Sequence, residues 1–421
     1  MAITTFRALN SRNYRLYFSG QSVSLIGTWM QRTAVSWVIY SMTHSGFMLG
    51  ISVFAGQFPS FLLSLFGGVI SDRYDKYKVL LTTQVASLVQ ATLLAILILT
   101  GKSTIWEILT LSVLLGIINA FDVPARQSLV YQMVDKKEDL SNAIALNSSM
   151  VNLARLIGPA ISGIVLQRFG AGVCFLANAV SFVAVIISLL LMKLAKYDRP
   201  PDTKKILTEL DEGFLYLKRT PSIGYAILML ACMSFFVLPF NALLPIYAKV
   251  IFTGNAATFG YINSFIGLGA IGGTFFLASL RPGSDLKSIL LINTLLFGLG
   301  LILFSHATYF PMAMFFATIC GFGMMSQTTI TNTIIQTNID PDMRGRVLSY
   351  FAMAFFGMMP LGSLLIGEVS EKFGAPDTLL SEGIIAICIA LLFSPFLRRD
   401  RLKKKKMLQK AQAKNDTTEA L

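Results

Sequence analysis

The chain has 421 residues, of which 54% are hydrophobic and only 14% are charged, and its formal net charge is +13. Soluble domains carry about 25% charged residues, so this composition argues against a soluble protein. Uncharged stretches such as 220–248 and 288–339 exceed the roughly 20 apolar residues that one membrane-spanning helix needs. We therefore expect an all-α polytopic membrane protein, with its positive charge in loops beside the membrane rather than on a nucleic-acid-binding surface.

Turn signals and charged residues divide the apolar sequence into twelve predicted spanning helices, because Gly, Pro, Asn or charge occurs at each break. The predicted helices cover residues 15–40, 46–71, 77–100, 104–126, 141–167, 170–192, 223–249, 256–280, 287–305, 308–337, 346–372 and 376–397. An even number of crossings places the two termini on the same side of the membrane.

The pattern of charge predicts four parts and an orientation. Residues 1–192 and 223–397 are two predicted halves of six helices, 193–222 is a connector with a stretch suited to an amphipathic surface helix (LTELDEGFLYLKRT), and 398–421 is a basic tail. Lys and Arg gather in the N-terminus, alternate loops and tail, and the remaining loops hold only Lys102, Arg168, Lys249 and Lys372. By the positive-inside rule, both termini are predicted to be cytoplasmic.

An internal repeat agrees with two related halves. Gly116 opens GIINAFDVPARQSLVYQMVD, Gly321 opens GFGMMSQTTITNTIIQTNID, and each segment ends in an Asp at the same spacing. Such a correspondence is typical of transporter halves related by a parallel repeat.

The sequence shows no grouping of residues that would suggest catalysis or metal binding. Each of the four cysteines lies alone in an apolar stretch, without metal-ligand spacing: Cys174, Cys232, Cys320 and Cys388. No nucleophile motif or phosphate-binding loop occurs either. We predict no enzyme activity, no metal and no cofactor.

A charged cluster follows a glycine pair in the loop predicted between the second and third helices. It reads GVISDRYDKYK at 68–78 and resembles the loop signature of the major facilitator superfamily, Gly-x-Leu-Ala-Asp-Arg-x-Gly-Arg. Matching positions are Gly68, Asp72, Arg73 and Lys76. The resemblance implies that they form a conformational latch with Asp122, which locks the halves in the outward-open state. Asp75 stands where glycine is usual, so either the turn is built differently or Asp75 adds an acid to the latch.

Other segments resemble a bacterial efflux subgroup of this superfamily that includes the enterobactin exporters. They are the N-terminal FRALNSRNYRLYFSGQSVSLIGTWMQ, FDVPARQ around Asp122, and residues 342–362. Gly158, Pro159 and Gly163 look like the second half of the antiporter motif, which is associated with exporters; a kinked helix eased by small residues explains them equally well. The resemblance implies a bacterial inner-membrane location.

Two arginines lie within predicted spanning helices, where a charge costs several kcal/mol. Arg32 continues a polar stripe formed by Gln21, Thr28 and Gln31, and Arg155 aligns with Asn152. The resemblance places these helices around a central cavity and adds Asn241, Gln327 and Asn332 from the second half. Two arginines favour an anionic or acceptor-rich cargo. In the alternative, each arginine pairs with a helix end or an acid and only fixes packing.

We therefore expect a secondary active transporter that exports small amphipathic or anionic molecules, siderophore or drug-like, by alternating access. Protons are the coupling ion that the resemblance implies, although the sequence places no Asp, Glu or His at mid-membrane. Transport of lipids or lysolipids is one alternative, and a membrane scaffold or sensor is another. The expected partners are a small-molecule substrate and membrane lipids, not nucleic acid.

Overall fold

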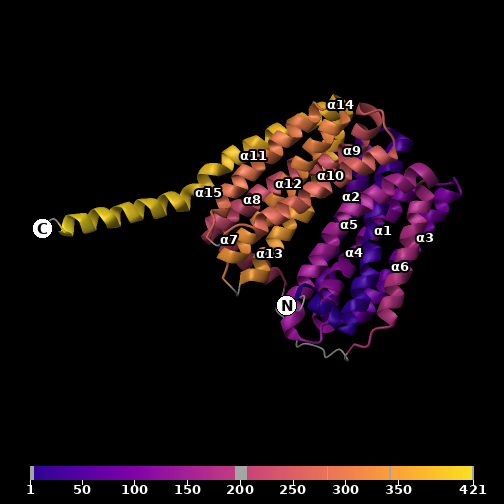
Figure 1. Cartoon of the computed structure of the whole chain (residues 1–421), viewed down its shortest axis with the longest axis horizontal. Helices are drawn as coiled ribbons and strands as arrows, with labels where there is room; N and C mark the ends of the chain where they lie inside the picture. The colour runs from indigo at the N-terminus through magenta and orange to yellow at the C-terminus, as the bar shows by residue number, and fades with distance from the viewer. Residues whose placement is uncertain (1–3, 195–205, 282, 341–342, 420–421) are drawn as a thin grey trace.

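The computed structural model describes the backbone of residues 4–194, 206–281, 283–340 and 343–419, and within these ranges it contains helices and turns but no strand (Figure 1). The first helices are η1 (Thr4–Asn10), α1 (Arg12–Thr43), α2 (Gly46–Arg73), α3 (Lys76–Leu99), α4 (Ile105–Met133), η2 (Lys137–Asp139), α5 (Leu140–Phe169) and α6 (Ala171–Leu190). We call residues 4–194 the N-terminal group.

The second set begins with α7 (Ile206–Arg219), the surface helix predicted in the connector. It continues through α8 (Pro221–Phe236), η3 (Leu238–Leu243), α9 (Leu244–Ile246), η4 (Tyr247–Ile251), α10 (Ala256–Ala278), α11 (Leu286–Ser305), α12 (Phe310–Asn338), α13 (Arg344–Ala352), η6 (Met353–Gly357), α14 (Met358–Phe373) and α15 (Ala375–Glu419). We call residues 221–397 the C-terminal group.

Two predicted spans are less regular than the sequence suggested, and one of them, predicted at 346–372, is divided into α13 and α14 by a π turn at η6. The span predicted at 223–249 changes from α8 through 3-10 turns to a π turn at η4, where Pro239 and Pro245 cannot donate backbone hydrogen bonds. The last predicted span, 376–397, agrees with the membrane-spanning segment Ala375–Leu397, but the helix itself does not end there, because α15 continues to Glu419 and leaves the bundle in Figure 1. The side chains of the predicted tail, 398–421, lie outside the described residues.

Eleven helical segments of the described chain are long and apolar enough to cross a membrane. The predicted span outside that set is α1, which has 32 residues but carries Gln21, Gln31 and Arg32 along its length. It packs against α5 and α6 inside the bundle. The structure therefore confirms the all-α polytopic fold, and α1 is polar because it contacts protein on several sides.

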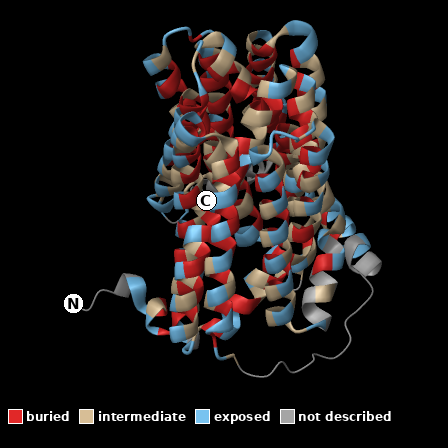
Figure 2. Cartoon of the chain, turned by 90° about the vertical axis from the view of Figure 1, so that its right-hand side faces the viewer, coloured by how far each residue is buried: buried red, intermediate tan, exposed pale blue. Residues whose placement is uncertain are grey.

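The two largest hydrophobic clusters lie in different groups, whereas a third combines residues between 30 and 175 with Ala256 of α10. The largest hydrophobic cluster takes its buried members from residues 226–397, and the next takes its members from residues 8–192. Buried positions follow the sides of helices that face other helices (Figure 2). The two groups lie side by side in Figure 1. The exact division at 193–222 stays a prediction.

The repeat predicted from Gly116 and Gly321 has a packing counterpart. Gly116 of α4 lies against Gly56 of α2, and Gly321 of α12 lies against Ile266 of α10. Both glycines therefore allow close contact between helices at matching places in the two groups. Connections alternate between two ends of the bundle, which we call the α1–α2 end and the α2–α3 end after the turns found there.

Candidate functional site

Two arginines approach one tryptophan ring between the groups. The guanidinium carbons of Arg32 and Arg155 each lie 5.1 Å from the centroid of the Trp29 ring, within cation–π range. Nη1 of Arg155 lies 3.7 Å from Sδ of Met325 on α12, so the contact reaches the C-terminal group. We call Trp29, Arg32, Arg155 and Met325 the arginine cluster.

The arginine cluster has unused capacity to bind an anion. Nε of Arg155 is buried without a hydrogen-bond partner, and Arg32 is exposed although it lies well inside a spanning helix. Neither arginine belongs to an ion pair found among the described residues. Guanidinium groups bind carboxylates and phosphates through paired donors. The arrangement therefore suits a cargo with acceptor groups, and it offers no support for fixation by a neighbouring acid.

Three other predicted cavity residues lie near this cluster or on its helices. Thr28 and Asn152 are half-buried on α1 and α5. Asn152 precedes Arg155 by three residues, so the two share a helix face. Nδ2 of Asn241 lies 3.7 Å from Sδ of Met324, next to Met325 in the chain. These residues extend the polar lining that the cluster begins.

Gln31 and Gln21 do not face the region between the groups. The Gln31 amide donates to Oε1 of Gln90 at 3.1 Å and accepts from Nδ2 of Asn178 at 2.8 Å. Gln21 is 3% exposed, and neighbouring Gly20 packs on Ser188 of α6. The stripe on α1 is split, because one side contacts α3 and α6 while Arg32 points elsewhere. Gln31 therefore helps to hold the N-terminal group together, whereas Gln21 is buried with no hydrogen-bond partner for its Oε1 among the described residues.

The two candidates from α12 are also placed away from the arginine cluster. Gln327 is fully buried, and both amide atoms lack partners among the described residues. It lies one turn after Gly323, which packs against Phe297 of α11, so this face points into the C-terminal group. Asn332 accepts from Gln336 at 3.1 Å near the α2–α3 end of α12. Gln327 and Asn332 are both polar, but polarity in the sequence did not show which face of α12 lies toward the N-terminal group.

Asp122 is the centre of a buried hydrogen-bond network at the α2–α3 end. Its Oδ2 lies 3.1 Å from Nη2 of Arg126, and its Oδ1 accepts from Oγ1 of Thr83 at 2.9 Å and from Nε2 of Gln84 at 2.7 Å. The carboxylate thus ties α4 to α3. The predicted relay from Asp122 to the loop stays a prediction, since the side chains of Asp72 and Arg73 lie outside the described residues.

The structure resolves the question that Asp75 raised. Its Oδ1 accepts from the backbone N–H of Tyr77 at 3.0 Å, which makes Asp75 the N-cap of α3, and Lys76 opens that helix. Its φ is −61°, so the turn does not need a glycine. Close approach of α2 to α4 occurs at Gly67, against Ala120. The surroundings of Gly68, a predicted latch residue, lie outside what the structure describes.

The antiporter-like residues form a contact between the two groups at the α1–α2 side of the bundle. A Cβ on Gly163 would lie 3.0 Å from Cα of Gly260 on α10, and Gly158 packs against Trp29. Pro159 is buried, and its carbonyl oxygen faces Gly260. The small residues therefore let α5 pack closely on α1 and on α10 at once.

A second close contact joins α2 to α14. A Cβ on Gly50 would lie 3.4 Å from Cα of Gly367, and Oγ of Ser363 donates to the Gly50 carbonyl at 3.1 Å. At the α1–α2 end itself, Oγ of Ser45 donates to Oε2 of Glu371 at 2.9 Å. These bonds close that end.

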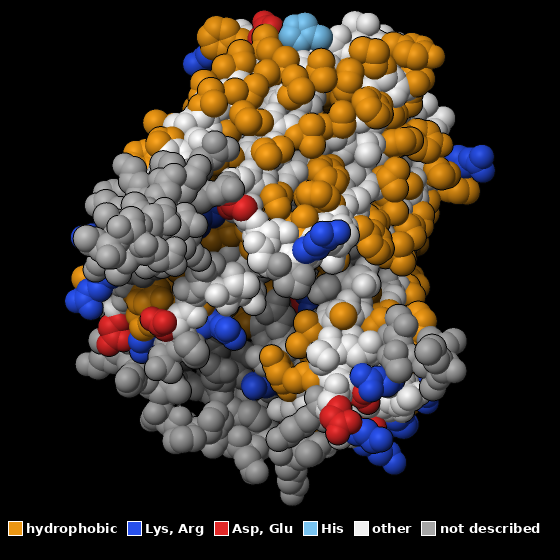
Figure 3. All heavy atoms as spheres, turned by 60° about the vertical axis from the view of Figure 1, so that its left-hand side comes forward, with side chains coloured by type: hydrophobic (Ala, Val, Ile, Leu, Met, Phe, Trp, Pro, Cys, Tyr) orange, Lys and Arg blue, Asp and Glu red, His pale blue; other side chains and the backbone are white. Residues whose placement is uncertain are grey.

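At the opposite end, no ion pair joins the two groups among the described residues. Ion pairs there stay within one group, as for Arg7 with Asp139, or between α7 and α13, as for Arg346 with Glu212. Figure 3 shows a broad hydrophobic surface over the upper part of one face and Lys, Arg, Asp and Glu toward the α2–α3 end. The molecule is therefore joined at the α1–α2 end and along its middle.

Glu382 is a buried acid that the sequence placed only near a helix end. Its residue exposure is 0%, and neither carboxyl oxygen has a partner in the described residues. The next residue, Gly383, packs against Gly298 and Ile302 of α11. The burial of Glu382 could have been predicted from the sequence only if the face of α15 that packs against α11 had been known.

In the described chain, eleven apolar segments long enough to cross a membrane and the more polar α1 form two groups joined by glycine contacts, which is the architecture of a membrane transporter of the major facilitator type. The profile of the transmembrane secretion effector family matches residues 3–419, and the chain belongs to that family within the superfamily. It is an integral membrane efflux transporter rather than an enzyme. The match confirms the superfamily and the efflux subgroup that the sequence motifs suggested.

Similar proteins cover nearly the whole chain. The staphyloferrin A transporter of Staphylococcus aureus is 29% identical over 92% of this chain and 97% of its own. The enterobactin exporter of Shigella boydii is 25% identical, with 90% of each chain covered. The inward-facing, unoccupied crystal structure of a bacterial homolog of the human lysosomal transporter Spinster has a TM-score of 0.72 at 13% identity, covering 92% and 98% of the two chains, and shares the fold.

Proposed function

We propose that this transporter exports small amphipathic or anionic molecules, siderophore or drug-like, by alternating access with protons as the coupling ion. The observation that carries the proposal is the arginine cluster, in which two guanidinium groups share the Trp29 ring. Nε of Arg155 has no partner there. Anionic oxygens of a cargo would satisfy these donors, and an aromatic part of the cargo would pack on the ring and on Met325.

The proposed orientation explains how cargo is loaded. With Lys and Arg on the cytoplasmic side, the α2–α3 end and both termini lie on the cytoplasmic side of a bacterial inner membrane. The contacts of Gly163 with Gly260 and of Ser45 with Glu371 then close the outer end. In this arrangement, cargo enters from the cytoplasm, and export requires those contacts to separate while the inner end closes.

Glu382 is the acid that we propose for proton coupling. Asp122 is already bonded by three donors, whereas both oxygens of Glu382 are buried without one. An unpaired carboxylate in a membrane costs several kcal/mol, so gain or loss of a proton there changes the stability of the surrounding packing. Glu382 lies seven residues after the start of α15, about 11 Å along the helix from the α1–α2 end. Proton exchange would therefore act on the end that must open.

A transport assay in proteoliposomes with and without a pH gradient tests this proposal. A catecholate siderophore, a cationic dye and a lysolipid are offered separately. We expect gradient-dependent movement of the anionic siderophore. Exclusive movement of the dye would contradict the role of the arginine cluster, and exclusive movement of the lysolipid would favour lipid transport.

Two matched variants test the coupling. Glu382→Gln is expected to abolish stimulation by the pH gradient while cargo exchange without a gradient continues. Glu368→Gln is the control, because Glu368 is only half-buried and is paired with Lys372 at 2.8 Å. Gradient stimulation that survives in Glu382→Gln would remove Glu382 from the coupling mechanism without excluding transport.

A further inference from the structure

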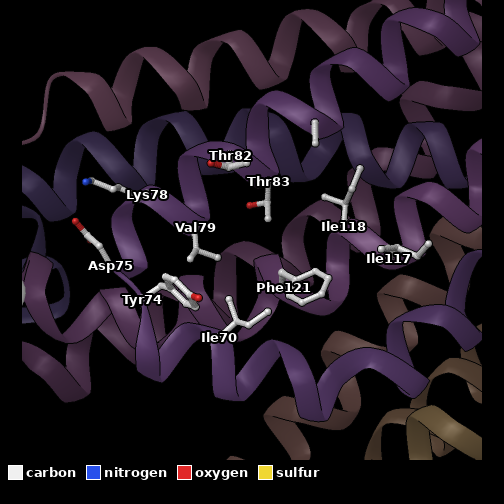
Figure 4. Close-up of a pocket in the computed structure, with 11 residues that line it drawn as sticks. Ile70, Tyr74, Asp75, Lys78, Val79, Thr82, Thr83, Ile117, Ile118 and Phe121 are labelled. Atoms are coloured by element: carbon white, nitrogen blue, oxygen red, sulfur yellow. The ribbon is translucent and has the colours of Figure 1, made fainter. Parts of the chain in front are cut away.

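A hollow lies away from the arginine cluster, between α2, α3 and α4. Its volume is about 550 Å³, and its lining residues are Ile70, Tyr74, Asp75, Lys78, Val79, Thr82, Thr83, Ala86, Ile117, Ile118 and Phe121. Figure 4 places Tyr74, Asp75 and Lys78 toward one end and Ile117 and Ile118 toward the other. We call this hollow the α2–α3 groove. No residue of the arginine cluster lines it, so it is separate from the proposed cargo site.

The α2–α3 groove has a charged mouth and an apolar interior. Lys78 is exposed, while Val79, Ile117 and Phe121 line the groove as partly buried side chains. Lys78 and Ala86 are eight residues apart on α3, so the groove follows that helix for about 12 Å at 1.5 Å per residue. An occupant must therefore combine a charged end with a narrow apolar part.

The charge at the mouth favours an anionic end. Oδ1 of Asp75 is occupied by the N–H of Tyr77, where it caps α3. Lys78 is exposed in the first turn of the same helix, and Lys76, two residues earlier, is half-buried. Clusters of basic residues at a membrane surface attract anionic phospholipids. The groove opens at the level where such headgroups lie if α2 and α3 span the membrane.

We propose that the α2–α3 groove binds an anionic phospholipid from the adjacent leaflet, with the phosphate at Lys78 and one acyl chain along Val79, Ile118 and Phe121. The lipid is a bound partner here, not the exported cargo. The inference rests on the proposed orientation only for the identity of the leaflet, which is then the cytoplasmic one.

Thr83 connects this groove to the Asp122 network. The residue lines the groove, and its hydroxyl donates to Oδ1 of Asp122 at 2.9 Å. Asp122 in turn lies 3.1 Å from Arg126. A lipid chain packed against Thr83 and Phe121 would hold α3 on α4 at the turn where the network joins them. Occupancy of the groove therefore stabilises the N-terminal group at its α2–α3 end.

Photolabelling of the full-length protein in vesicles tests the site. The probe is phosphatidylglycerol with a photoreactive group in one acyl chain, diluted in phosphatidylcholine, and labelled residues are mapped by mass spectrometry. We expect labels to concentrate on Thr82, Ile117 and Phe121. Lys78→Ala should lower this labelling about fivefold, as expected for loss of one Lys near an anionic headgroup. Lys136→Ala is the control, because Lys136 is exposed at the same end but lies outside the groove.

A second pair of variants tests the acyl chain position. Ala86→Phe fills the groove and should suppress labelling, whereas Val85→Phe, on an adjacent side chain that is 44% exposed, should not. Labelling that is equal with Lys78→Ala, or equal with a photoreactive diacylglycerol that lacks phosphate, would overturn the proposal. Uniform labelling of lipid-facing helices would overturn it too. Because labelling needs no cargo, failure of the export proposal would leave this test unaffected.

Discussion

The contact between α5 and α10 should control opening of the outer end, and Gly163→Ala tests it. The added Cβ would lie 2.9 Å from the carbonyl oxygen of Ala256 and 3.0 Å from Cα of Ala257 and of Gly260. Carbon atoms pack best at about 3.5–4.0 Å. All three neighbours are backbone atoms, which cannot rotate away, so α5 and α10 must separate by a few tenths of an ångström or more.

Overpacking of this kind costs about 1–3 kcal/mol. The cost falls only on the state in which the α1–α2 end is closed, because the two helices separate in the other state. About 1.4 kcal/mol shifts a two-state equilibrium tenfold, so we expect a shift of roughly 5- to 150-fold toward the outward-open state. Gly163→Val should increase the shift.

The assay measures the distance between spin labels at positions 42 and 373, where Met42 and Phe373 are exposed at the α1–α2 end of the two groups. The native cysteines are first replaced, and the labels are attached to cysteines at the two positions. Gly56→Ala is the matched control, because a Cβ there has no atom within 4 Å. We expect longer distances in Gly163→Ala alone. Identical distance distributions for the two variants would refute the reasoning.

Three further variants test other parts of the molecule. Asp122→Asn should lower the thermal unfolding temperature, because removing one partner of a buried ion pair costs about 3–5 kcal/mol; an unchanged temperature would show that Arg126 needs no carboxylate. Asp75→Ala should destabilise α3 by about 1 kcal/mol, measured by denaturant unfolding, and Asp75→Asn should restore it; equal effects of both would exclude the N-cap role. Trp29→Leu should raise the transport KM about 5- to 30-fold, for about 1–2 kcal/mol of lost cation–π interaction; the same change in Trp106→Leu, at a 71% exposed position, would contradict a specific role.

Much of the fold could be predicted because the membrane limits the choices. Uncharged runs of sufficient length predicted the helices, and charged or turn-forming residues predicted their ends. The irregular span after α8 was missed because its prolines lie in an otherwise apolar run that also fits a continuous helix. The turn at Asp75 was left open for a different reason: whether an Asp caps the next helix depends on one backbone angle, which the sequence does not contain.

The candidate site was predictable only in part. Arg32 and Arg155 stood out because charge in a membrane is costly. Trp29 was missed, although it lies one helical turn before Arg32 and is one of three tryptophans in the chain. Gln31 was placed in the cavity because polarity on a helix marks contact with protein or water, and α1 contacts protein on several sides. From the sequence, Glu382 was placed only near a helix end, since its burial depends on the packing of α15 against α11.

The most direct test of the central claim is pH-gradient-driven transport of an anionic siderophore by the wild type and by Arg155→Met in proteoliposomes. Loss of a charge-assisted hydrogen bond costs about 1.5–3 kcal/mol, so the KM should rise about 10- to 150-fold. Transport of a neutral analogue of the same size should change little. An unchanged KM for the anion, in a variant with wild-type stability, would contradict the assignment of the arginine cluster as the cargo site.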